Sequence, residues 1–276
     1  MNYLERFRVK PGARVKLAHI DPDFRDHHEG HKEAAHEIER YEEKLRELQS
    51  LLYAEQQRSL LICLQAMDTG GKDGIINHFL GAMNPQGCRI AAFKKPSEEE
   101  AAHDFLWRVH RVAPAKGEVV IFNRSHYEDV LIVRVHNLAP KNVLSDRYDQ
   151  INEFEQALVE NDTIILKFFL HISKQEQLAR FKKRLDDPAK RWKISEDDYK
   201  ERKFWKDYME AYEEALSRCN TKHAPWFIIP ADHKWFRNLA VARIVVEYLE
   251  GLHMKYPKPS VDIEQIRRDY HAAKKA

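Results

Sequence analysis

The sequence predicts an α/β fold in which a parallel sheet is covered by helices on both faces. Short apolar runs alternate along the chain with helical stretches. The runs are apolar throughout instead of alternating with polar residues, which is typical of strands buried on both sides. A glycine-containing loop follows the first run and leads into a helix. The five strand candidates are residues 60–64, 89–93, 119–122, 163–170 and 226–229.

A long amphipathic helix is expected before the first strand, from about residue 30 to residue 57. Its apolar residues recur at steps of three and four, which is the spacing of one helix face. They are Ile38, Tyr41, Leu45, Leu48 and Leu52. Five such positions make only about two heptads, so packing on its own domain is favoured over a two-stranded coiled coil.

Shorter helices are expected between the later strands, and three of them begin with a capping signal. In such a signal a serine precedes an acidic residue by three positions, and the two side chains satisfy free backbone N–H groups. The pairs are Ser97 with Glu100, Ser173 with Glu176, and Ser195 with Asp198. Further helices are expected at residues 75–83 and 238–252.

The composition of the 276 residues indicates a globular protein, with 43% hydrophobic and 33% charged residues. A formal net charge of only +2 argues against a general nucleic-acid coat protein. The longest apolar runs stop far short of the roughly 18 residues that span a membrane, and residues 1–6 carry charge where a signal peptide is apolar. Cys63, Cys88 and Cys219 have neither disulfide-framework nor zinc spacing, so a cytoplasmic location is expected.

The domain organisation is expected to be simple, because no internal repeat, low-complexity segment or linker divides the chain. We expect an irregular N-terminal arm over residues 1–29 that lies on the domain. One domain should cover residues 30–256, followed by a C-terminal tail over residues 257–276.

The loop after the first strand approximates the phosphate-binding pattern G-x-x-x-x-G-K-[ST], with Ala66 at the first glycine position and Asp73 where Ser or Thr is usual. Glycines let backbone N–H groups converge on an anion, and the helix N-terminus and Lys72 add positive charge. Asp68 is the metal-side candidate, because carboxylates suit hard cations. The alternative is an ordinary strand–helix turn with a solvated lysine. The candidate phosphate ligands are Gly70, Gly71, Lys72, Asp73 and Gly74.

Polar residues follow the third strand, at the sheet edge where ligands bind in open α/β folds. Asn123 stands where phosphoryl-transfer enzymes of this architecture place a metal-holding Asp, and Glu128 is a candidate for the missing carboxylate. Arg124 is suited to hold a phosphoryl oxygen through its planar guanidinium. The alternative is that Asn123 caps the next helix and Arg124 pairs with Glu128 or Asp129.

Residues 178–193 form a basic segment, with seven Lys and Arg against two Asp. Its net charge of +5 leaves −3 for the rest of the chain. A solvated basic face is one explanation. The functional interpretation is a lid over about residues 178–206 that closes on the transferring phosphoryl group, as in mononucleotide kinases. The lid candidates are Lys182, Lys183, Arg184 and Arg191.

Together and in this order, the motifs resemble those of family-2 polyphosphate kinases over roughly residues 30–255. The stretches that carry the resemblance are residues 67–74, 123–129, 167–173, 187–193 and 224–226. Asp73, which departs from the general loop pattern, matches this family. The resemblance implies a P-loop kinase fold related to thymidylate kinase, with a helical lid. It also implies Mg²⁺ dependence, with Mn²⁺ as an alternative, and phosphoryl transfer between inorganic polyphosphate and a nucleotide.

The resemblance also implies roles for single residues. Asp68 corresponds to the loop carboxylate that organises metal and phosphates, and Lys72 to the loop lysine. Asn123 and Arg124 stand at the second nucleotide-triphosphatase motif, and Arg184 belongs to the lid. Many family members have Asp where Asn123 stands. Asn with a following Glu resembles the subgroup that phosphorylates both AMP and ADP, which makes Glu128 a candidate metal ligand beside Asp68.

The expected activity is polyphosphate:nucleotide phosphotransfer, forming ADP from AMP and ATP from ADP. The expected partners are polyphosphate and adenine nucleotides, with guanine nucleotides as an alternative, and neither nucleic acid nor membrane. A homodimer or homotetramer is expected from the long helix over residues 30–57. The alternative functions are an ATP-dependent mononucleotide kinase and a non-catalytic polyanion-binding protein.

Overall fold

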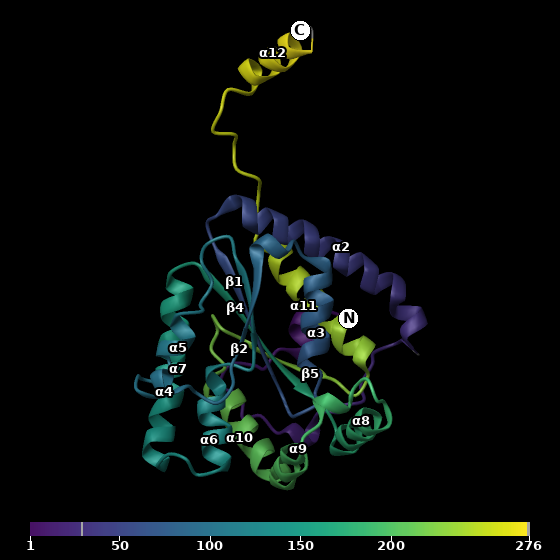
Figure 1. Cartoon of the computed structure of the whole chain (residues 1–276), viewed down its shortest axis with the longest axis vertical. Coiled ribbons are helices and arrows are strands. Elements are labelled where there is room, and N and C mark those ends of the chain that lie inside the picture. Colours follow the sequence, from purple (N-terminus) through teal and green to yellow (C-terminus); the bar gives the residue numbers. More distant parts are fainter. Residues whose placement is uncertain (29, 275–276) are drawn as a thin grey trace.

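The computed structural model describes residues 1–28 and 30–274 and is built around a five-stranded parallel sheet (Figure 1). The strand order is β2-β3-β1-β4-β5, so the first strand lies at the centre. All five predicted strands are present and parallel, which confirms the predicted fold class. Their bounds are Ser59–Ala66 (β1), Cys88–Ala92 (β2), Val119–Asn123 (β3), Thr163–His171 (β4) and Trp226–Pro230 (β5).

The central strands are apolar throughout because both sheet faces are covered. In β1, Leu60, Ile62 and Leu64 belong to the larger of two hydrophobic clusters, whereas Leu61 and Cys63 belong to the other. Successive side chains of a strand point to opposite faces, so one continuous apolar run supplies two cores. The edge strand β2 is the exception, since only one of its five residues is buried.

Helices α2 (His31–Glu55), α3 (Lys72–Ala82) and α11 (Lys234–Glu250) pack against one another on one side of the sheet (Figure 1). In α2, Tyr41, Leu45 and Leu52 are buried, and Ile38 and Leu48 are partly buried in the same cluster. The apolar face of α2 therefore packs on α11 of its own chain. This confirms packing on its own domain over the coiled coil.

The other side of the sheet carries α7, which packs on β4. The lid candidate corresponds to α8 and the short helices that follow it, below the sheet in Figure 1. The remaining helical segments are α4 (Glu98–Ala101), α5 (Trp107–His110), η3 (His126–Val130), α6 (Ile132–Val135), α7 (Lys141–Glu160), α8 (Lys174–Asp186), η4 (Arg191–Lys193), α9 (Glu196–Glu201), η5 (Arg202–Phe204) and α10 (Trp205–Arg218), with η2 (Pro85–Gly87) before β2.

The N-terminal segment is more ordered than the irregular arm that the sequence predicted. It contains α1 (Tyr3–Phe7) and η1 (Leu17–His19), and Tyr3 is completely buried. These two short helices show no helical periodicity in the sequence, because aromatic packing on α11 orders the segment: the ring of Tyr3 lies 6.0 Å from that of Phe236. Residue 29 of the predicted arm lies outside the described residues.

The predicted tail contains α12 (Ile263–Ala273), which stands away from the body at the end of an extended segment (Figure 1). All described residues from 255 to 274 are exposed. Residues 275 and 276 of the tail lie outside the description. The assignment of residues 30–256 to one domain stays a prediction. Within the described residues, no helix is both long and apolar enough to cross a membrane.

The capping signals are confirmed at two of the three helices. Ser97 with Glu100 and Ser195 with Asp198 form reciprocal capping boxes. Ser173 accepts a hydrogen bond from the backbone N–H of Glu176, but its own N–H donates to Asp232 Oδ1 at 2.8 Å. The third capping box was therefore wrong, because the carboxylate of Glu176 is engaged by Arg180 instead.

Candidate active site

A cavity of about 870 Å³ opens at the carboxyl ends of the strands. Because β1 is central and β3 adjoins it, the loops that follow these two strands meet at this edge. The cavity is lined by Asp68, Thr69, Gly70, Gly71, Lys72, Asp73, Gly74, Ala92, Phe93, Lys94, Asn123, Arg124, Arg180, Lys183, Arg184, Asp186, Asp187, Lys190, Lys193, Asp198, Lys234 and Arg237. It therefore contains all five predicted phosphate ligands of the loop.

The loop between β1 and α3 has the geometry of an anion site. Gly71 precedes the first residue of α3 and has φ +107°, in the left-handed region that favours glycine. No side chain caps this helix N-terminus, so its backbone N–H groups face the cavity free of a side-chain acceptor. Lys72 Nζ donates to the carbonyl of Ala66 at 3.1 Å, which folds the lysine back along the loop.

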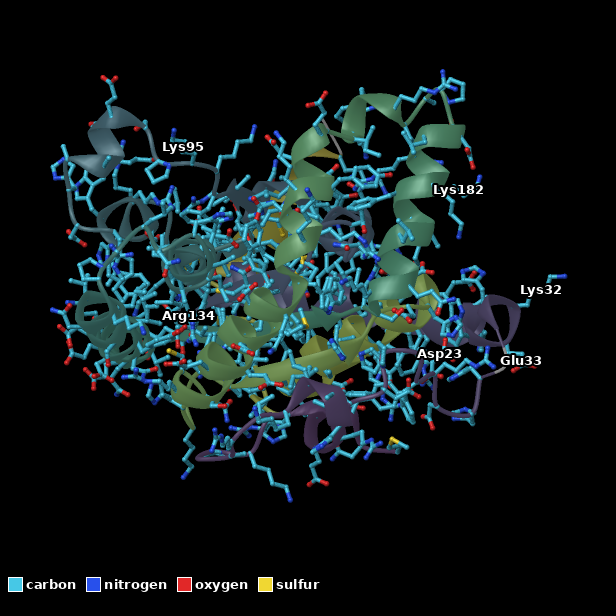
Figure 2. All side chains as sticks on the ribbon, turned by 90° about the horizontal axis from the view of Figure 1, so that it is seen from below. Asp23, Lys32, Glu33, Lys95, Arg134 and Lys182 are labelled. Carbon is cyan, nitrogen blue, oxygen red and sulfur yellow. The ribbon has the colours of Figure 1, made fainter. Side chains whose placement is uncertain are left out.

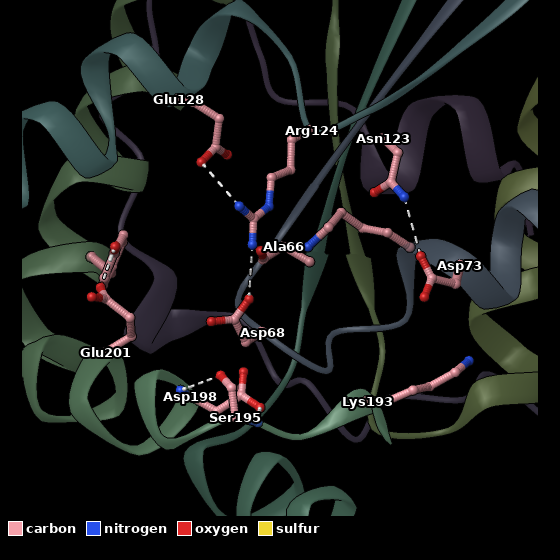
Figure 3. Close-up of polar contacts among 12 residues, drawn as sticks. Ala66, Asp68, Asp73, Asn123, Arg124, Glu128, Lys193, Ser195, Asp198 and Glu201 are labelled. Carbon is pink, nitrogen blue, oxygen red and sulfur yellow. Dashed lines mark hydrogen bonds and ion pairs between the residues drawn. The ribbon is translucent and has the colours of Figure 1, made fainter. Parts of the chain in front are cut away.

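Arg124 lies between two carboxylates (Figure 3). Its Nη2 donates to Asp68 Oδ1 at 3.1 Å, and its Nη1 lies 4.0 Å from Glu128 Oε2. Burial raises the pKa of Glu128, although Arg124 and Lys72 act in the opposite direction. Burial likewise lowers the pKa of Lys72, and the nearby Arg124 adds to this. Two cations and two carboxylates thus share one half-buried volume.

Asn123 and Asp73 join the two loops. Asn123 Nδ2 donates to Asp73 Oδ1 at 3.1 Å (Figure 3). Asn123 does not cap the next helical segment, because Ser125 does so by accepting from the N–H of Tyr127. The alternative prediction was that Asn123 caps this helix and that Arg124 pairs with Glu128 or Asp129. Only the contact between Arg124 and Glu128 is present. Asp129 pairs with Arg108 and Arg147 instead.

The donor set fits a hard divalent cation, because Asp68 and Asp73 supply carboxylate oxygens from the loop. Glu128 supplies another from η3 and is outside the cavity lining. No three described metal-type ligands of this cavity approach one another within 4.8 Å. The one described group that does is His27, His28 and Glu37, next to the start of α2. The separated carboxylates of the cavity suit Mg²⁺, which typically takes one or two carboxylates and completes its shell with substrate phosphates and water.

The lid candidates divide into two groups. Lys183 and Arg184 line the cavity, and Arg184 is held by the carbonyl of Lys193 and lies 3.8 Å from Asp198. Lys182 is outside the lining: it points outward from α8 and pairs with Asp186 (Figure 2). Arg191 is also outside, since its Nε donates to the carbonyl of Leu185.

Sequence reasoning missed four charged residues of the cavity that lie outside the basic segment. Within that segment it did not name as site candidates five further charged lining residues, Arg180, Asp186, Asp187, Lys190 and Lys193. Lys94 follows the edge strand β2, and Asp198 was interpreted only as a cap. Lys234 and Arg237 lie on the first turn of α11, directly after β5. The rule that ligands bind at strand ends would have identified these two residues, had it been applied to the fifth strand as well as to the first and third.

Comparison with known proteins agrees with this geometry. A family model, polyphosphate kinase 2 (PPK2), matches residues 28–257. An AMP/ADP-polyphosphate phosphotransferase of Meiothermus ruber is 52% identical, over 95% of this chain and 99% of that one. An ADP-polyphosphate phosphotransferase of Rhodopseudomonas palustris is 44% identical, over 92% of each.

A solved structure is also similar over almost the whole chain. It is the crystal structure of polyphosphate kinase 2 from Arthrobacter aurescens TC1, with a TM-score of 0.95 and 42% identity, covering 99% of this chain and 97% of that one. The resemblance inferred from the motifs is thereby confirmed, and so is the fold that it implied. The chain belongs to the polyphosphate kinase 2 family.

Proposed function

We propose that this chain transfers a phosphoryl group between inorganic polyphosphate and AMP or ADP, reversibly, with Mg²⁺. The observation that carries the proposal is the cavity in which the loop N–H groups, Lys72, Arg124 and the lid cations surround one volume. A polyanionic donor and a nucleotide phosphate repel each other unless such cations offset their charge. The name of the similar Meiothermus ruber protein supports AMP and ADP as alternative acceptors.

The proposed mechanism is in-line attack of the acceptor's terminal phosphate oxygen on the end phosphorus of polyphosphate. As the new O–P bond forms, the bond from this phosphorus to the bridging oxygen breaks, and the polyphosphate shortened by one unit leaves with that electron pair on its terminal oxygen. The attacking oxygen is already anionic, so the reaction needs no general base and no covalent enzyme intermediate. The work of the protein is positioning and charge neutralisation. We assign these roles to Lys72, Arg124 and Arg184, with phosphate held at the uncapped start of α3. The loop glycines Gly70, Gly71 and Gly74 shape this loop, and the N–H groups of Gly70 and Gly74 donate to the carbonyls of Met67 and Gly71. Asn123 and Asp73 hold the two loops together.

We assign the metal to Asp68 and Glu128. Phosphotransferases of this kind generally need a divalent metal, and an ion held by these two carboxylates would supply positive charge that offsets the charge of the phosphates. In the structure Asp68 holds Arg124, so the same carboxylate orients the guanidinium. Mn²⁺ is the alternative ion, because it accepts the same oxygen ligands.

One assay distinguishes this function from its rivals. Purified protein is incubated with Mg²⁺, long-chain polyphosphate and either AMP or ADP, and nucleotides are separated by chromatography. Formation of ADP from AMP and ATP from ADP supports the proposal. Transfer from ATP alone would instead identify a mononucleotide kinase, and polyphosphate binding without transfer a polyanion-binding protein. GMP and GDP in the same assay test guanine acceptors.

The proposal includes a homodimer or homotetramer, but α2 is no longer its basis, because its apolar face is used within the chain. The better candidate is α12, where Ile263, Ile266 and Tyr270 recur on one face and are exposed. An isolated helix of 11 residues is marginal in water, so α12 needs a partner surface. The described residues of its own body supply none, since no residue of α12 is buried. We propose a second copy as that partner.

Light scattering tests this assembly. Ile266→Glu should lower the mass of the particle, whereas Arg267→Glu on the same exposed helix should not. Equal masses for both variants and the unchanged chain would remove α12 from the interface.

Cytoplasmic location is a further part of the proposal, supported by three free cysteines, Cys63, Cys88 and Cys219.

A further inference from the structure

Two histidines and a glutamate come together where the N-terminal segment meets α2. His27 and His28 precede the helix, and Glu37 lies on its second turn. One ligand atom of each of the three residues lies within 4.8 Å of the other two, which is true of no other group of metal-type ligands in the described part of the chain. None of the three lines the candidate active site.

The spacing of the two closest ligand atoms is near the spacing that a bound ion imposes. His28 Nε2 lies 3.0 Å from Glu37 Oε2. Nitrogen and oxygen ligands held at about 2.0–2.1 Å by a tetrahedral zinc ion are about 3.3 Å apart. The pair therefore needs only a small adjustment to hold an ion between its two atoms.

His28 is the buried member of the group. It is 6% exposed, and its ring lies edge-on to that of Trp235 on α11, with the centroids 5.8 Å apart. Its Nδ1 is buried without a hydrogen-bond partner among the described residues. Buried polar atoms are normally paired, and a bound ion or water is a common explanation of an exception. The hydrogen-bonding capacity of this ring is thus only half used within the fold.

His27 is the exposed member, with 71% of its side chain accessible. Its ring lies over that of His28, with centroids 4.1 Å apart. Its Nδ1 lies 3.3 Å from Asp26 Oδ2, an oxygen that also accepts a hydrogen bond from Tyr3 Oη at 3.0 Å. A histidine that binds metal through one ring nitrogen typically faces a carboxylate with the other. Nε2 of His27 is therefore the nitrogen available to an ion.

Glu37 divides its two oxygens between different partners. Oε1 lies 3.2 Å from Arg243 on α11 and 3.8 Å from Arg40, whereas Oε2 faces the buried imidazole. Arg243 is shared with Glu247, at 2.6 Å. Together with Asp26, these neighbours provide three carboxylates against two guanidinium groups. A cation that reaches the two imidazoles therefore meets a net negative charge among them.

The donor set decides the class of the ion. Imidazole nitrogen with a carboxylate oxygen suits zinc and its first-row neighbours, whereas Mg²⁺ takes oxygen ligands. Three protein ligands leave the fourth position of a tetrahedral ion to water. We propose that His27, His28 and Glu37 bind one divalent cation of the zinc class, separate from the Mg²⁺ assigned to the active site. The ion fastens the segment before α2 onto that helix.

Zinc binding by the purified chain tests the site. Metals are first removed with a chelator, and calorimetry with Zn²⁺ is run in excess Mg²⁺, which occupies the oxygen ligands of the active site. We expect one site per chain with a Kd below ~10 μM. With Co²⁺ in place of Zn²⁺, the absorption spectrum should show no thiolate charge-transfer band, which a cysteine ligand would produce. No saturable Zn²⁺ binding, or a spectrum with that band, would overturn the proposal.

His27→Ala is the decisive variant, because an exposed side chain can be removed without disturbing the fold. Its affinity for Zn²⁺ should fall about tenfold or more, while the melting temperature of the metal-free protein stays unchanged. His36→Ala is the matched control, since this histidine is exposed on α2 next to Glu37 and outside the group. It should bind Zn²⁺ as the unchanged chain does. Equal affinities of His27→Ala and the unchanged chain would place the ion elsewhere.

Thermal melting tests whether the ion fastens the segment. Zn²⁺ should raise the melting temperature of the unchanged chain and of His36→Ala, because a ligand that binds the folded state stabilises it. The rise should be much smaller for His27→Ala, and an equal rise would overturn the proposal. Binding and melting are both read without substrate, so the result does not depend on whether the chain transfers a phosphoryl group.

Discussion

Lys167 and Arg237 are both buried cations, but only Lys167 has a carboxylate that neutralises its charge. Lys167, on β4, is completely buried, and its three ammonium protons meet three acceptors: Glu155 Oε2 at 2.5 Å, the carbonyl of Cys219 at 2.7 Å and Tyr127 Oη at 2.8 Å. Arg237 has no carboxylate. The comparison shows that one buried cation is neutralised within the fold, whereas the other has no ion-pair partner among the described residues.

The cluster around Lys167 also contacts η3, the segment that carries part of the candidate active site. Tyr127 and His126, which both contact Glu155, belong to η3, the segment that follows Arg124 and contains Glu128. Burial alone would raise the pKa of Glu155, but Lys167 and the hydrogen bond from His126 outweigh it, so that the pKa is lowered. The ion pair therefore fixes the backbone that carries the two site residues.

The largest expected effect is on turnover. Lys72→Ala removes the loop cation and should lower kcat by about a thousandfold, equivalent to ~4 kcal/mol. Stability should not fall, because burial already disfavours the charge of Lys72. Steady-state rates and thermal melting measure both. Activity within tenfold of the unchanged enzyme would remove Lys72 from the chemistry.

The second-largest expected effect is on the free energy of unfolding, when Lys167 is replaced. Lys167→Ala leaves the carboxylate of Glu155 buried alone and should cost about 3 kcal/mol of unfolding free energy. The double variant Lys167→Met/Glu155→Leu should recover part of this loss, because it removes both charges. Urea denaturation gives the values. A loss below about 1 kcal/mol would mean that the two clusters do not differ as described.

Gly71→Ala tests the contact between the loop and Arg237. The substitution combines a strained backbone at φ +107° with a clash against the guanidinium, and should cost about 2 kcal/mol. Gly81→Ala is the matched control, in the helix α3 that Gly71 precedes. Gly81 has open space and no positive φ, so alanine there should be neutral or stabilising by up to ~1 kcal/mol. Similar melting temperatures for the two variants would contradict the packing.

The pH dependence of turnover tests Glu128. Burial raises its pKa above the ordinary value of 4.5, so as the pH falls the carboxylate takes up a proton earlier than an exposed glutamate does. We expect kcat to decline through that raised pKa. Glu128→Gln should lower kcat about tenfold at neutral pH and lose this decline. Glu210→Gln on the surface of α10 is the control. An unchanged acid limb in Glu128→Gln would assign the titration to another group.

The smallest effect is expected at Lys182. This side chain is 74% exposed and pairs with Asp186 one helical turn away. Lys182→Ala should change the unfolding free energy by less than ~0.5 kcal/mol and KM for polyphosphate by less than twofold. A larger change in KM would restore Lys182 to the ligand site that the sequence predicted.

The strands and the glycine-containing loop after β1 were predictable because their signals are local. A few neighbouring residues suffice to predict each of them: the apolar run 60–64 predicts a strand, and the glycine before Lys72 predicts a turn into a helix. Contacts across the chain were not predictable. Tyr3 is buried by residues more than 200 positions away, and the N–H of Ser173 is taken by Asp232. Charge counting found the basic segment, but only geometry separates Lys183 from Lys182.

The N-terminal helix has a practical consequence for protein engineering. The rings of Tyr3, Phe7 and Phe24 surround Phe236, with centroids 6.0, 6.1 and 5.8 Å from it, and Phe236 is the chain neighbour of Arg237. A fusion or truncation that disturbs the first seven residues would loosen the start of α11 at the floor of the cavity. Donor affinity would then depend on the design of a terminus that touches no substrate, whereas a fusion joined beyond α12 leaves this aromatic support intact.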